Sequence, residues 1–263
     1  MSSSTYFHSL QWKTPLFSKG VLTGANEAQE WMLPHWWSQY TAASEEPVTF
    51  IDFGMSVSAR NWCAKKGKVV TCSLPVGSIK KRDAISSVTA KFWERVYPGN
   101  LWAARHIWFA KPLAFMQTRY QWNLWLDLDC EVKKPLSDFF TLADNRSGLA
   151  VAPTTPALQK ASRITGLLKP GEQAYNPGVV VFRHKSPAIL KWAELSLYRN
   201  EEFLGDENSL SRALLEGQFK VTALPLIYNW PFFYGKNPAA KIVHFFTASG
   251  KQALTKKIFK NLT

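Results

Sequence analysis

The stretch 122–131, WNLWLDLDCE, places an apolar run, 124–126, directly before two aspartates, Asp127 and Asp129. Such a run is typical of a buried strand, in which alternate side chains point to the same face. We therefore expect the Asp127 and Asp129 carboxylates to point the same way at the end of a strand. Two buried carboxylates repel each other unless a cation lies beside them. A hard divalent cation takes oxygen ligands and also binds substrate phosphates.

The composition is that of a globular protein with a basic surface. Of the 263 residues, 46% are hydrophobic, and 32 Lys and Arg against 19 Asp and Glu give a formal net charge of +13. This composition excludes a disordered chain. The positive charge favours anionic partners, such as nucleotides, nucleic acid or an acidic membrane face.

The cysteines and the N-terminus bear on location. Cys63, Cys72 and Cys130 form no C-x-x-C pair, and an odd number argues against a disulfide framework, so we expect reduced thiols and a cytoplasmic setting. The N-terminal residues lack the features of a signal peptide, and no run approaches the ~20 apolar residues of a membrane span. Peripheral contact of the basic segment 254–260 with the inner membrane face is an alternative, although a surface helix is the simpler interpretation.

Strand-like runs alternate with helical stretches along the chain. Strands are expected at 20–23, 48–52, 68–72, 124–127, 148–152, 178–182, 221–224 and 241–246. Helices are expected from Asn26 with a kink at Pro34, over 56–65, around 102–109, from Pro112, and over 187–198 and 206–216. This alternation predicts an α/β fold with a Rossmann-like, mostly parallel central sheet flanked by helices. Ligands bind beyond the carboxyl ends of such strands, where we expect Asp52 and Asp127.

The chain shows no repeat, low-complexity segment or long linker. We therefore expect one domain over residues 20–254. Residues 1–19 are expected to form an N-terminal lead-in, and residues 255–263 a basic C-terminal tail.

Six motifs follow one another in a defined order: LTGANE (22–27), IDFGMS (51–56), WLDLDCEV (125–132), YNPGVVVF (175–182), GDENSL (205–210) and KIVHFF (241–246). In this order and spacing they resemble glycosyltransferases of the GT-A fold, and most closely family 8, the retaining sugar transferases. The resemblance covers roughly residues 18–252. It implies an enzyme, a hexosyltransferase, that moves a sugar from a nucleotide-diphosphate donor, expected to be a UDP-sugar, to an acceptor hydroxyl with retention.

The same resemblance implies a metal site. Asp127 and Asp129 would bind a divalent ion that holds the donor diphosphate, with His244 as the third ligand. Two carboxylates and an imidazole suit Mn²⁺, with Mg²⁺ as the alternative. Without the resemblance, His244 is better interpreted as a hydrogen-bonded core histidine between Val243 and Phe245.

The donor contacts are also assigned by resemblance. The residues that would position the sugar are Asn176, Asp206 and Glu207, where Glu207 replaces a glutamine of the family. A carboxylate there can stabilise an oxocarbenium-like centre or trap it covalently. The residues that would hold the nucleotide and its phosphates are Thr23, Asn26, Asp52, Arg105, Lys111, Leu128, Gly178 and Lys251. Arg105 and Lys111 are alternatives for one basic contact, and Lys251 departs from the family pattern because extra residues precede Gly250 and no Pro-Trp follows.

Other functions remain open on the sequence. A strand ending in Asp-x-Asp also occurs in phosphatases that form an aspartyl phosphate, but these need a late acidic pair, and the chain has no Asp-Asp. A non-catalytic nucleotide- or nucleic-acid-binding protein would explain basic charge interleaved with aromatics. Because the aromatics lie in apolar periodic segments, we expect them in the core and expect no nucleic-acid partner. The acceptor, a saccharide, lipid or protein, is not indicated.

Overall fold

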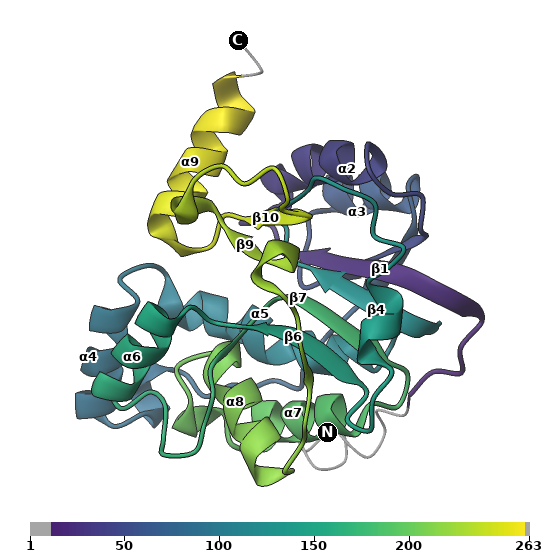
Figure 1. The fold of residues 1–263 in the computed structure, drawn as a ribbon. Coiled ribbons are helices and arrows are strands. Elements are labelled where there is room, and N and C mark those ends of the chain that lie inside the picture. Colours follow the sequence, from purple (N-terminus) through teal and green to yellow (C-terminus); the bar gives the residue numbers. More distant parts are fainter. Residues whose placement is uncertain (1–11, 261–263) are drawn as a thin grey trace.

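A seven-stranded sheet with the order β3-β2-β1-β4-β7-β6-β8 forms the centre of the structure, a computed structural model that describes residues 12–260 (Figure 1). Its strands are β1 Phe17–Ala25, β2 Val48–Asp52, β3 Lys68–Thr71, β4 Tyr120–Leu126, β6 Leu149–Pro153, β7 Tyr175–Arg183 and β8 Thr222–Ala223. Among these strands β7 alone runs antiparallel to its neighbours, β4 and β6. The predicted mostly parallel sheet is therefore confirmed. Residues 1–11 of the expected lead-in and 261–263 of the expected tail lie outside the described residues.

The central strands are buried on both faces, as their apolar runs require. Every residue of β2 is buried. Val21, Leu124 and Leu126 belong to one hydrophobic core, whereas the alternate residues Leu22 and Trp125 belong to the core on the opposite face. The sheet thus separates two apolar layers that the helices cover.

The main helices are α2 Leu33–Thr41, α3 Val57–Ala64, α4 Ser87–Val96, α5 Leu101–Phe115, α6 Pro156–Ile164, α7 Pro187–Tyr198, α8 Asp206–Glu216 and α9 Thr247–Lys260. Helices α5, α7 and α8 pack on one face of the sheet, and α2, α3 and α9 contribute to the core on the other face (Figure 1). The side chains of Ser56, Asn100 and Ser186 cap the amino ends of α3, α5 and α7.

A second sheet has the order β5-β10-β9, with β5 at Cys130–Val132, β9 at Trp230–Pro231 and β10 at Ile242–His244. The strand expected at 241–246 therefore belongs to this small sheet and not to the central one. Short 3₁₀ helices complete the chain: η1 Glu30–Met32, η2 Arg82–Ala84, η3 Phe140–Ala143, η4 Asn200–Glu202, η5 Leu226–Tyr228 and η6 Phe232–Tyr234.

Two helix predictions that depended on proline were wrong. No helix starts at Asn26; α2 begins at Leu33, and Pro34 occupies its first turn, where the missing N–H removes no helical hydrogen bond. Pro112 does not start a new helix but lies inside α5, which is capped at Asn100 and buried along its second half. Core packing of α5 therefore outweighs the local cost of this proline.

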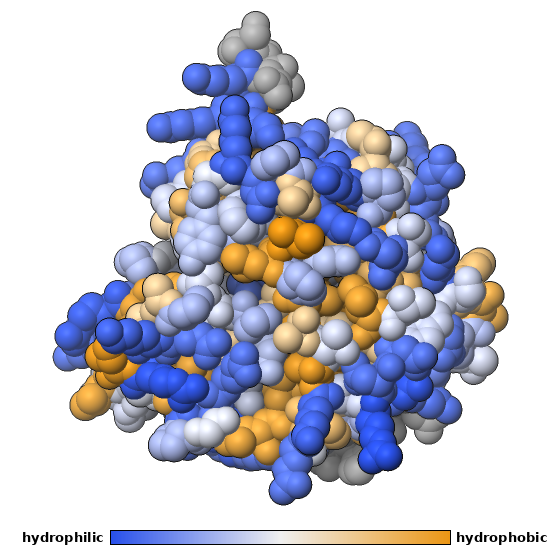
Figure 2. All heavy atoms as spheres, viewed as in Figure 1, coloured by the Kyte–Doolittle hydropathy of each residue, from blue (hydrophilic) through white to orange (hydrophobic). Residues whose placement is uncertain are grey.

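The described basic residues of the expected tail belong to helix α9, whose last turn carries Lys257 and Lys260. Helix α9 continues through the boundary expected at 254, and hydrophilic side chains surround its last turns, at the top of the view in Figure 2. Among the helices of residues 12–260, none has the length and apolar character needed to cross a bilayer.

Candidate active site

Predicted site residues from several strands lie at one edge of the central sheet. The parallel strands β2 and β4 end there, at Asp52 and just before Asp127. Because β7 runs in the opposite direction, its amino end, with Asn176 and Gly178, lies at the same edge. The reversal of one strand thus brings residues from both halves of the chain together.

Asp127 and Asp129 lie in a turn, because β4 ends at Leu126. The N–H of Cys130 donates to the carbonyl of Asp127 at 3.0 Å, which closes the turn. The expectation that the two carboxylates lie at the end of a strand was therefore wrong in its secondary structure. Both residues line one cavity, but their carboxylates have different partners.

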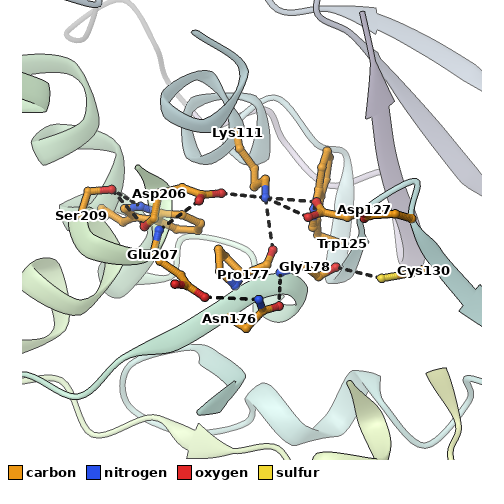
Figure 3. Close-up of polar contacts among 12 residues, drawn as sticks. Lys111, Trp125, Asp127, Cys130, Asn176, Pro177, Gly178, Asp206, Glu207 and Ser209 are labelled. Carbon is orange, nitrogen blue, oxygen red and sulfur yellow. Dashed lines mark hydrogen bonds and ion pairs between the residues drawn. The ribbon is translucent and has the colours of Figure 1, made fainter. Parts of the chain in front are cut away.

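The carboxylate of Asp127 is held by a cation and an indole. Its Oδ1 lies 3.1 Å from Nζ of Lys111 and accepts a hydrogen bond of 2.6 Å from Trp125 Nε1 (Figure 3). Lys111 is buried, and its Nζ also lies 2.8 Å from Asp206 Oδ2. Although burial disfavours the ammonium, the two aspartates raise the pKa of Lys111 above its ordinary value. Lys111 therefore stays charged and joins the Asp127 turn to α8.

The carboxylate of Asp129 faces His244. Strand β10 pairs with β5 so that His244 lies opposite Cys130, and its Nε2 lies 3.1 Å from Asp129 Oδ1. Burial opposes ionisation of Asp129, but His244 and Lys251 outweigh it and hold the pKa of this carboxyl well below its usual range. Gly178 makes room for the imidazole, since a Cβ at this position would lie 2.0 Å from His244 Cε1.

These side chains suit a divalent metal. One ligand atom each from Asp129, Cys130 and His244 lies within 4.8 Å of the others. Burial, with Asp129 and Asp127 nearby, raises the pKa of the Cys130 thiol well above its usual value. The carboxylate oxygen of Asp129 and the imidazole nitrogen of His244 fit a divalent metal ion. Cys130 had no signal in the sequence beyond its place next to Asp129.

The sugar-positioning candidates form a second polar group. Asp206 begins α8, and burial raises its pKa against the opposing effect of Lys111. Asn176 Nδ2 donates to Glu207 Oε1 at 3.3 Å, and Asn176 Oδ1 accepts from the N–H of Gly178 at 3.1 Å (Figure 3). Burial and the neighbouring Asp206 raise the pKa of Glu207 to about 7.

The nucleotide candidates Thr23 and Asn26 lie at the end of β1. Thr23 Oγ1 and Asn26 Oδ1 are buried oxygens without a hydrogen-bond partner among the described residues. Asp52 differs, since its Oδ1 accepts from the N–H groups of Gly54 and Met55 at 2.8 and 2.6 Å. Asp52 therefore stabilises the turn after β2.

The structure distinguishes Arg105 from Lys111, the two alternatives for one basic contact with the donor. Arg105 is fully buried, and its guanidinium donates to the carbonyls of Asn200, Phe203 and Leu204. Burial lowers its pKa to about 10. Arg105 thus fixes the segment that leads into α8, whereas Lys111 lines the cavity.

The cavity is lined by residues from three segments of the chain, 24–32, 107–129 and Lys251. Its predicted lining residues are Lys111, Asp127, Leu128, Asp129 and Lys251. Gln29 and Trp108 also line it, and sequence reasoning missed both. It also missed Asn229, a buried residue that contacts both His244 and Asn176.

No protein-family model matches the chain, and no curated protein matches its sequence. Solved structures do match. The galactosyltransferase LgtC in complex with donor and acceptor sugar analogs superposes with a TM-score of 0.60 at 14% identity, over 92% of this chain and 95% of that chain. Mouse xyloside xylosyltransferase 1 superposes with a TM-score of 0.54 at 14% identity, over 86% of this chain and 97% of that chain. The glycosyltransferase GlyE of Streptococcus pneumoniae TIGR4 superposes with a TM-score of 0.57 at 16% identity, over 88% of this chain and 55% of that chain. The chain therefore has the GT-A fold of these glycosyltransferases.

Proposed function

We propose that this protein is a metal-dependent glycosyltransferase that moves a sugar from a nucleotide-diphosphate donor, most simply a UDP-sugar, to an acceptor hydroxyl. The observation that carries the proposal is that Asp129, whose carboxylate faces His244, lines one cavity together with Lys111 and Lys251. A divalent cation and two ammonium groups suit a diphosphate. The galactosyltransferase with bound donor and acceptor analogs shares this fold.

In this proposal Asp129 and His244 hold Mn²⁺, with Mg²⁺ as the alternative, and Asp127 is the further candidate ligand. The ion would supply positive charge for the diphosphate that leaves the sugar. Lys251 is placed to add to that charge, because it lines the cavity and lowers the pKa of Asp129. Thr23 and Asn26, with their unpaired oxygens, are proposed to contact the nucleoside.

Asn176, Asp206 and Glu207 are proposed to position the donor sugar. They form one hydrogen-bonded group on β7 and α8, connected through Lys111 to Asp127. A carboxyl with a pKa of about 7 can serve as a carboxylate or as a hydrogen-bond donor near neutral pH. Transfer with retention follows the family 8 resemblance, and a carboxylate at 207 suits a positively charged sugar centre.

We further propose a cytoplasmic location, which the three free and buried cysteines support. The proposed acceptor is a saccharide, a lipid or a protein. Contact of the basic end of α9 with an anionic membrane is the alternative that a lipid acceptor would favour.

The test is a screen of UDP-sugars, measured as a rise in melting temperature and as donor hydrolysis, with and without Mn²⁺. Asp129→Ala and His244→Ala should each abolish the Mn²⁺-dependent rise and reduce hydrolysis by at least about 100-fold. Asp144→Ala, at an aspartate whose side chain is 69% exposed, is the matched control and should change neither. Full activity in the Asp129 and His244 variants would refute the proposed metal site.

A further inference from the structure

Asn229 connects the metal-binding histidine to the proposed sugar-binding asparagine. It follows η5 and is buried, with 3% of its surface exposed. Its Oδ1 lies 2.9 Å from Nδ1 of His244, and its Nδ2 donates to Oδ1 of Asn176 at 2.9 Å. One carboxamide therefore contacts both halves of the candidate site.

The direction of these hydrogen bonds is set by the backbone. The N–H of Gly178 can only donate, and it donates to Oδ1 of Asn176 at 3.1 Å. Asn176 consequently directs its Nδ2 toward Glu207, as Figure 3 shows. Asn229 must then present its own NH₂ group to Asn176 Oδ1, which leaves Asn229 Oδ1 as the acceptor for His244.

This orientation selects one tautomer of His244. An amide oxygen only accepts, so Nδ1 of His244 carries the proton that it donates to Asn229. Nε2, which lies 3.1 Å from Asp129 Oδ1, is then the nitrogen left to offer its lone pair to an ion bound beside Asp129. Nε2 is thus the metal-binding nitrogen. Hydrogen bonding of the other ring nitrogen is the usual way in which proteins fix a ligating histidine.

We propose that Asn229 is a positioning residue that fixes the His244 tautomer for metal binding and couples the metal site to Asn176. This inference rests on the proposed function. A metal that pulls His244 into place also orders Asn229 and Asn176, so metal binding should favour donor-sugar binding, and the reverse. The backbone N–H of Gly178 is the fixed starting point of the relay Gly178–Asn176–Asn229–His244.

Two variants separate the two roles of Asn229. Asn229→Ala removes both hydrogen bonds, so we expect Mn²⁺ affinity, measured by titration calorimetry without any donor, to fall 10- to 100-fold. Asn229→Asp keeps an oxygen acceptor for His244 but cannot donate to Asn176. It should hold Mn²⁺ within about threefold of the wild type and lose the extra affinity for a UDP-sugar over UDP. Asn237→Ala, which removes a cap in an exposed turn of the same segment, is the control and should change neither quantity.

A spectroscopic readout distinguishes positioning from a loss of folding. In ¹⁵N-labelled protein loaded with diamagnetic Mg²⁺, the imidazole nitrogens of His244 should report a single Nδ1–H tautomer, and Asn229→Ala should report a mixture. Unchanged Mn²⁺ affinity and an unchanged His244 tautomer in Asn229→Ala would overturn the role of Asn229 but leave the proposed function standing. If Asn229→Ala does not fold, Asn229→Asp decides: equal loss of Mn²⁺ and UDP-sugar affinity would overturn the separate roles. A wild-type protein that binds neither Mn²⁺ nor UDP would overturn the proposed function as well.

Discussion

Glu207 is a carboxyl group held where its charge is unfavourable. Burial and Asp206 raise its pKa from 4.5 to about 7, so its contribution to stability is fully present below pH 4.5 and is lost as pH rises through 7. Glu207→Gln stays neutral and avoids this loss. We expect its stability relative to the wild type to increase by about 2 kcal/mol between pH 5 and pH 8.5 in urea unfolding. A difference that stays constant with pH would mean that the pKa is not raised, and Glu194→Gln on the exposed side of α7 is the control.

Lys111 holds two carboxylates that would otherwise repel each other. Replacing it with methionine leaves Asp127 and Asp206 without their buried cation, so Lys111→Met should lose about 3–5 kcal/mol in the free energy of unfolding. The double variant Lys111→Met with Asp206→Asn should recover part of that loss, because one of the stranded charges is removed. Additive losses in denaturant unfolding would contradict this coupling.

At the level of single residues, the sequence predicted the chemical role of a side chain better than it predicted the contacts of that side chain. The importance of Asp129 and His244 came from motif order, because His244 alone had the environment of a core histidine. The choice between Arg105 and Lys111 depended on which side of α5 faces the cavity, and both residues are buried. Asn229 has no local signal, since its role arises only where β10 and β7 meet.

Helix α9 is the element that brings Lys251 to the cavity, and a buried carboxylate anchors it. Glu131 on β5 lies 2.6 Å from Lys257 on α9, 2.5 Å from Lys133 and 2.8 Å from His35 on α2. Burial opposes ionisation, but hydrogen bonds from His35, Lys133 and Lys257 lower the pKa of Glu131 to about 2. The lowered pKa means that this stabilisation is present above pH 4.5 and is lost as pH falls through 2.

Glu131→Gln should therefore loosen α9 and lower stability by about 2–4 kcal/mol at pH 7, with little difference from the wild type near pH 2. Hydrogen exchange is expected to speed up in α9 and at the start of α2, while exchange in α7 stays unchanged. Equal exchange in α9 of both proteins would show that Glu131 does not anchor it.

The elements themselves were predictable where local signals agreed. The expected bounds 187–198 and 206–216 match α7 and α8, since Ser186 caps α7 with its side chain and Gly205 and Gly217 flank α8. The predictions at Pro34 and Pro112 were wrong because the effect of a proline depends on its position within a helix, which packing decides. The reversal of β7 and the separate sheet of β10 depend on long-range pairing, for which a single sequence carries no signal.

At the scale of the whole molecule, the candidate site belongs to both halves of the chain. Thr23 and Asp52 come from the first strands, whereas Asn176, Asp206 and His244 come from the last third. Strand β4 pairs with β1 on one side and β7 on the other, so the halves share one sheet. This arrangement supports the proposal that residues 20–254 form a single domain.

A single domain with a shared site should unfold in one transition. Binding of the donor should then raise the free energy of that whole transition. Tryptophan fluorescence and far-UV circular dichroism should give coincident denaturation curves, because the tryptophans lie in both cores and the helices on both faces. UDP with Mn²⁺ at about 100 times its dissociation constant should stabilise both curves equally, by about 2.7 kcal/mol. Mn²⁺ alone should shift them less, because in the proposed site it would contact only Asp129 and His244. Two transitions, of which UDP shifts only one, would show that the halves fold separately and that nucleotide binding needs only one of them.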